Sequence, residues 1–84
     1  MKMNQDQLST EWSSYDLALS ATLITLGYQL KHTDKSHPSK VKFVFESDPA
    51  IQKIVNGFWS DNLLVNPRSM FDNLRLLKSQ IYSS

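Results

Sequence analysis

The sequence predicts a small α+β domain in which a mainly antiparallel sheet of two to three strands is covered by three helices. Apolar residues follow a helical spacing before Gly27 and a spacing of two beyond it, which marks a change from helix to strand. Two further helix starts are marked by Asp48-Pro49 and Asn66-Pro67, each a capping side chain followed by the proline favoured at the first helical position. The predicted order is helix, strand, strand, helix, short strand, helix.

The first predicted helix begins after Ser13, which stands three residues before Asp16 as in a capping box. Gly27 is suited to end it, because glycine readily adopts the left-handed conformation found at helix ends. The apolar residues of this helix spread around most of its circumference and are Leu17, Ala18, Leu19, Ala21, Leu23, Ile24 and Leu26. A helix of this kind is either the central helix of the domain or faces a second subunit.

Two strands are predicted beyond Gly27. Tyr28, Leu30 and His32 alternate with polar residues, and Val41, Phe43 and Phe45 do the same except at Val44. The intervening TDKSHPSK is rich in turn-forming residues. We therefore expect an antiparallel hairpin with a loop longer than a tight turn.

The second half of the chain predicts two amphipathic helices separated by a short strand. Ile51, Ile54, Val55, Phe58 and Trp59 form the apolar stripe of the first, and Met70, Phe71, Leu74, Leu77 and Ile81 form that of the second. Residues 63–65 form an apolar run of strand length. We expect Phe43, Phe58 and Leu74 to be nearly buried.

The 84 residues are enough for one domain, with a flexible lead-in over residues 1–12 and a compact unit over residues 13–84. There is no cysteine, which excludes disulfides, thiolate metal ligands and cysteine nucleophiles. No basic-then-apolar leader opens the chain, and no apolar run approaches the length that crosses a bilayer. We expect a cytoplasmic protein that neither enters a membrane nor uses a small-molecule substrate.

Four segments, SSYDLALSATLITLGYQL, FVF, FWSDNLLVNP and FDNLRLLKSQIY, resemble those of a small uncharacterised prokaryotic family catalogued as a domain of unknown function. The resemblance covers about residues 13–82. It implies a phage, mobile-element or other prokaryotic setting and an accessory role, and it carries no known catalytic or binding residue.

The predicted hairpin loop gathers residue types that occur in catalytic and metal sites, namely His32, Asp34, Ser36 and His37. A catalytic constellation must be held rigidly, and usually draws on distant segments of the chain. A metal site needs three or four convergent ligands, whereas this loop offers three at most. We therefore expect solvated loop residues, no enzymatic activity, no metal and no cofactor.

The same segment gathers four of the nine cationic side chains, Lys31, Lys35, Lys40 and Lys42. Lysines on one face of a two-stranded ribbon can bind a nucleic-acid backbone without reading its sequence. They also serve as an ordinary solvated face that protects an edge strand. The net charge of only +1 favours the second interpretation, because nucleic-acid-binding domains are usually strongly basic.

The nearly all-apolar first helix favours a protein partner or a homo-oligomer such as a dimer. Val44 and Leu76 are apolar residues on faces expected to be exposed, and either would mark the contact. We therefore expect a small accessory or adaptor module that acts by protein–protein association. Nucleic-acid backbone contact is the alternative, and a small hydrolase is a distant one.

Overall fold

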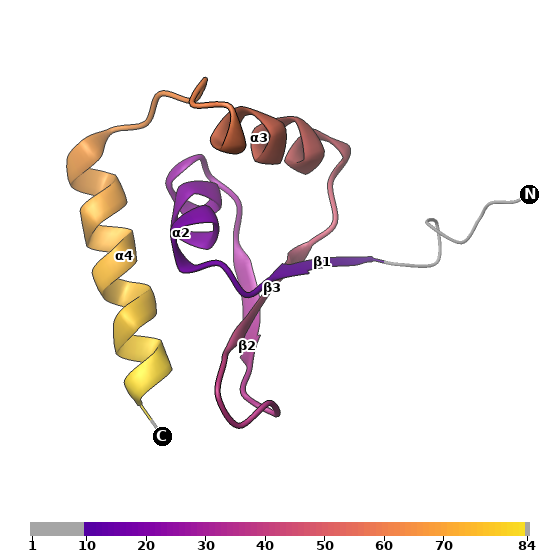
Figure 1. Cartoon of the computed structure of the whole chain (residues 1–84), viewed down its shortest axis with the longest axis vertical. Helices are drawn as coiled ribbons and strands as arrows, with labels where there is room; N and C mark the ends of the chain where they lie inside the picture. Colours follow the sequence, from indigo (N-terminus) through magenta and orange to yellow (C-terminus); the bar gives the residue numbers. More distant parts are fainter. Residues whose placement is uncertain (1–9, 84) are drawn as a thin grey trace, which may run out of the picture.

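The computed structural model describes residues 10–83 and has the α+β fold that the sequence predicts, with three helices and a three-stranded antiparallel sheet. The strands are β1 (Glu11–Ser14), β2 (Leu30–Asp34) and β3 (Lys42–Glu46). The helices are α2 (Leu17–Thr25), α3 (Pro49–Trp59) and α4 (Pro67–Tyr82). Figure 1 shows α4 alongside α2 on one side of the molecule, with α3 across one end.

The third strand is not the one that was predicted. It is β1, in the segment expected to be a lead-in, whereas residues 63–65 form no strand. Trp12 explains the difference, because it lies opposite Phe45 in the β1–β3 ladder and its ring centroid is 6.0 Å from that of Phe45. The domain therefore includes residues 10–12 of the expected lead-in, while residues 1–9 lie outside the described residues.

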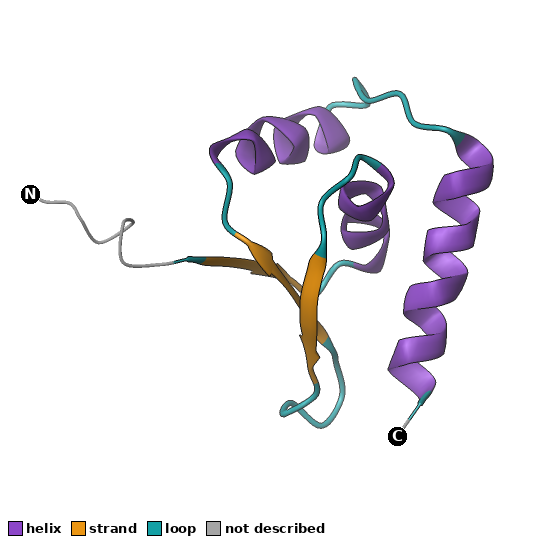
Figure 2. Cartoon of the chain, turned by 180° about the vertical axis from the view of Figure 1, so that it is seen from behind, coloured by secondary structure: helices purple, strands orange, loops and turns teal. Residues whose placement is uncertain are grey.

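The strand order is β1-β3-β2, so the last strand of the sequence occupies the centre of the sheet. Both neighbours run antiparallel to β3, which makes β1 and β2 parallel to each other and joined by α2 (Figure 2). The β2–β3 hairpin contains a bulge at Lys31, where the pairing shifts between Leu30 and His32.

Local side chains set the helix ends. Asp16, rather than Ser13, caps α2 by accepting the amide of Leu19 at 2.8 Å. Gly27 has a φ of 104°, which costs glycine little, and its amide donates to the Ile24 carbonyl. The Tyr28 amide donates to the Leu23 carbonyl, which completes a Schellman ending. Asp48 and Asn66 cap α3 and α4, as predicted.

The core lies where α2, α3, α4 and β3 meet. Its buried residues are Ala21, Leu23, Phe43, Phe45, Ile51 and Leu77. Phe43 is nearly buried, as expected, whereas Leu74 packs against this cluster but is only partly buried. Phe58 is only partly buried and lies outside the cluster, so its assignment to the core was wrong.

Helix α2 is covered by other elements of its own chain. Its residues from Leu19 to Leu23 are buried, and α4, α3 and β1 all pack against it. It is therefore the central helix, the first of the two alternatives that its sequence left open. Polar contacts with α4 include a hydrogen bond of 2.9 Å from the Asn73 side-chain amide to the Thr25 hydroxyl.

Replacing Phe45 by alanine should lower the free energy of unfolding by about 3–5 kcal/mol, because the ring is fully buried. Phe71→Ala is the matched control: that ring is 63% exposed, and its loss should change stability by only about 0.5 kcal/mol. Urea unfolding of both variants measures the difference. Equal losses would contradict the assignment of the core.

Replacing Ser20 by alanine should raise stability by about 1 kcal/mol. The Ser20 hydroxyl is fully buried and has no hydrogen-bond partner among the described residues, so folding removes it from water without compensation. Thr25→Ala should do the opposite, because the Thr25 hydroxyl donates to the Ala21 carbonyl and accepts from Asn73. A melting temperature that falls in Ser20→Ala would show that the hydroxyl is satisfied.

Candidate functional site

The lysines of the hairpin do not form an open basic face. Lys31 forms ion pairs with Glu11, at 3.1 Å, and with Glu46, at 3.8 Å. Lys42 lies 4.0 Å from the carboxylate of Asp34. The acids thus lie beside the cations on the ribbon, which reduces the positive potential that a phosphate backbone would meet.

Strand β1 and the bulge bring these charges together. In the β1–β3 register Glu11 lies opposite Glu46, which would place two carboxylates side by side without a cation between them. The extra residue in β2 is Lys31, and its amine lies close enough to both carboxylates to compensate their charge. The hydrogen bond that the Lys31 amine donates to the Glu11 carboxylate is the main reason that the pKa of Lys31 is raised.

The other two candidate lysines also have partners. The Lys35 amine donates to the main-chain carbonyl of Ser83, next to the C-terminal end of α4. The Lys40 amine lies 4.6 Å from the centroid of the Tyr15 ring, a cation–π contact. The structure therefore brings the four lysines to one hairpin, as predicted, but engages each of them in a contact within the chain.

Asp34 and His37 of the hairpin make local turn contacts. The Asp34 carboxylate accepts the Ser36 amide at 2.9 Å, and the ring Nδ1 of His37 accepts the Ser39 amide at 3.1 Å. The His37 ring is exposed, and so is that of His32. Among residues 10–83 no group of three or more histidines and acids is arranged to hold a metal ion.

Ser36 is the main cause of a change in the acidity of Asp34. Its hydrogen bonds, together with the nearby charge of Lys42, hold the pKa of Asp34 below its ordinary value of 3.8. The ionised carboxylate therefore helps to keep the turn between β2 and the loop in shape.

The two residues expected to contact a partner differ in their exposure to solvent. Val44 is only 4% exposed, so its assignment to an outer contact was wrong for this chain. It lies in the central strand between Ser13 of β1 and His32 of β2, and a strand with neighbours on both sides leaves little of a small side chain accessible. Leu76 is 50% exposed on α4 and lies at the edge of a hollow of about 410 Å³.

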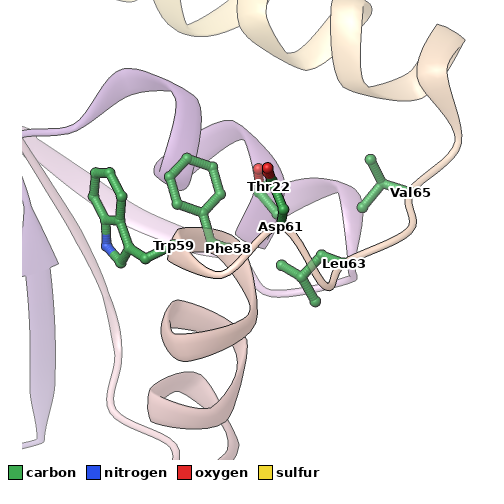
Figure 3. Close-up of a pocket in the computed structure, with 6 residues that line it drawn as sticks. All are labelled: Thr22, Phe58, Trp59, Asp61, Leu63 and Val65. Atoms are coloured by element: carbon green, nitrogen blue, oxygen red, sulfur yellow. The ribbon is translucent and has the colours of Figure 1, made fainter.

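An apolar surface that the sequence did not single out lies where α3 leads into α4. A pocket of about 420 Å³ is lined by Phe58, Trp59, Leu63 and Val65, with Thr22 and Asp61 between them (Figure 3). Trp59 is 66% exposed and Leu64 is 94% exposed. We call Phe58, Trp59, Leu63, Leu64 and Val65 the junction surface.

Backbone geometry at the end of α3 shapes this surface. Asp61 has a φ of 61°, a conformation that Asp tolerates better than most residues, and it turns the chain back over the helix. Leu63 then packs above Gly57, where a β-carbon would lie only 3.1 Å from the leucine side chain. The apolar run read as a strand is therefore a loop folded against α3. The missed signal was Gly57, which permits close packing on a helix otherwise free of glycine.

Together, the fold and the junction surface define a small α+β domain with an exposed apolar surface beside its central helix. The chain belongs to the family described as a domain of unknown function, DUF5659, whose model matches residues 10–83. The expected resemblance to an uncharacterised family is thereby confirmed. No curated protein and no solved structure matches the chain. In the described part of the chain, no helix has both the length and the apolar character to cross a membrane.

Lowering the pH should release the turn at Asp34 only below pH 3.8, the ordinary pKa of an aspartate. Since the folded-state pKa is lowered, the stabilisation is complete above the unfolded value and is lost as the pH falls through the folded value. The amide resonance of Ser36 in an NMR titration reports this step, and Asp34→Asn should abolish it. A midpoint at or above the ordinary value would contradict the assignment.

Proposed function

We propose that this protein is a small non-enzymatic accessory or adaptor module that binds a protein partner through the junction surface. The setting that we propose is the cytoplasm of a prokaryote, with the gene carried by a phage or another mobile element. The family match supports only the domain type, so the proposal depends on the surface.

The observation that carries the proposal is the exposure of Leu64 and Trp59 beside an apolar pocket. Burying a side chain of this size is worth about 1.5–3 kcal/mol, so leaving two of them in water is unfavourable for an isolated domain. Tryptophan in particular is enriched among the residues that dominate protein–protein binding energy. A partner that inserts an aliphatic side chain between Phe58, Leu63 and Val65 would cover both.

Binding to a different protein is favoured over self-association. The main argument for a dimer was the apolar surface of the first helix, and α3, α4 and β1 now account for the burial of that surface. The junction surface is a separate feature, built from the end of α3 and the loop that follows. Its pocket suits an aliphatic anchor supplied by another chain.

The alternative, contact between the hairpin lysines and a nucleic-acid backbone, is less favoured. Lys31 and Lys42 have acidic partners in the described chain, and binding a phosphate would require those pairs to be loosened. A small hydrolase remains the most distant alternative, because both histidines are exposed, His32 on β2 and His37 in the hairpin loop.

Trp59→Ser combined with Leu64→Ser should weaken capture of the partner at least about tenfold, since the dominant aromatic anchor and its neighbour are both removed. Gln52→Ser with Lys53→Ser is the matched control, because both side chains are exposed on α3 outside the junction surface. The wild-type chain and both variants are used to capture proteins from a prokaryotic lysate, and candidates lost only with the first variant are identified by mass spectrometry.

Each candidate is then expressed, purified and titrated against the same three proteins by calorimetry. Saturable binding that only the first variant loses supports the proposal. If no purified candidate distinguishes the two variants, the junction surface is not the binding site.

A further inference from the structure

Helix α4 carries a second unusual surface on the side that faces away from α2. Its stripe consists of Arg68, Phe71, Arg75, Lys78 and Tyr82. The spacing is three, four, three and four residues, which places all five side chains on one face of a helix. All five residues are exposed, with Phe71 at 63% and Tyr82 at 84%. We call this the α4 stripe.

The charges of the α4 stripe are less engaged than those of the hairpin. Within the described chain neither Arg68 nor Lys78 forms an ion pair, and Arg75 has only Asp72, at 3.6 Å. Both side chains of that pair are more than half exposed, so the interaction is weak. The stripe therefore presents three cations and two aromatic rings over about 21 Å of helix, at 1.5 Å per residue.

We propose that the α4 stripe binds an acidic amphipathic helix of a partner protein. A spacing of three and four residues is the pattern by which one helix packs along another. The cations would pair with carboxylates on the facing helix, and the two rings would pack against apolar side chains between those carboxylates. The order along the stripe is one cation, a ring, two cations and a ring, so the partner should place acidic residues opposite the cations and apolar residues opposite the rings.

A second copy of this chain does not have the required chemistry. Helices α2 and α3 contain no acidic residue, and α4 contains only Asp72. The acids of the sheet are engaged with lysines on its strands. The facing helix must therefore come from a different protein.

A nucleic-acid strand fits less well. Three cations would release few counterions, and the slope of log affinity against log salt would be only about −2 to −3. The other candidate source of positive charge, the hairpin, has acids beside its lysines. Binding through α4 alone would therefore be weak at physiological salt.

The inference rests on the proposed function only in taking the ligand to be a protein. It concerns a different surface and a different chemistry, so an experiment can contradict the inference without contradicting the proposed function, and the reverse. The probe is a synthetic helical peptide with leucines at three- and four-residue spacing flanked by glutamates. Its control is a peptide of the same composition in scrambled order, and an oligo-deoxythymidine strand is the nucleic-acid probe.

Each probe is added to the isotope-labelled full chain, and amide shifts are followed by NMR. The helical peptide should shift amides along the α4 stripe and bind at least about tenfold more weakly to Arg75→Glu with Lys78→Glu, because attraction becomes repulsion. Phe71→Ala should weaken binding without altering charge. Gln52→Glu with Lys53→Glu, a negative charge change on α3 of three units against four on α4, should leave binding unchanged, as should the serine variant of the junction surface.

The inference is overturned if the scrambled peptide binds as tightly, or if both glutamate variants bind alike. It is also overturned if the oligonucleotide binds the stripe more tightly than the peptide, which would assign the surface to nucleic acid. Circular dichroism and the melting temperature of every variant confirm that the chain remains folded during the comparison.

Discussion

Every strand pairing in the described sheet passes through β3, which makes this strand the constraint on which the remaining structure depends. Phe43 and Phe45 face the helices, while Val44 between them is enclosed on the opposite face. A strand buried on both faces is common in large parallel sheets and less so in a small antiparallel one. Here it lets a five-residue strand hold two partners, one of which comes from far earlier in the chain.

The helices are organised around α2 in the same way that the strands are organised around β3. The sheet, α3 and α4 surround this helix, which accounts for apolar residues around most of its circumference. Thr25 receives a hydrogen bond from Asn73 of α4, which adds a polar contact to the apolar packing between the two helices. The outer face of α4, and the end of α3 with the loop that follows it, are thus left exposed, and these are the two surfaces proposed for binding.

Local signals in the sequence predicted most elements of the fold. The caps at Asp48 and Asn66 and the glycine ending at Gly27 act over a few residues, so the sequence alone reveals them. The strand β1 and the burial of Val44 could not be predicted in this way, because both follow from pairing between distant segments. The same limit applied to the site. The four lysines share one hairpin in the sequence, but the acids beside Lys31 include Glu11 of an unpredicted strand, so their pairing could not be foreseen.

The bulge at Lys31 has a consequence for how this protein avoids unwanted assembly. A regular edge strand offers a row of free main-chain donors and acceptors to any extended chain, and pairing of this kind leads to aggregation. In β2 the extra residue interrupts that row and places a charged side chain at the interruption. Addition of further strands to the sheet is therefore disfavoured at this edge. Binding of other molecules along a helix such as α4 does not carry the same risk of aggregation.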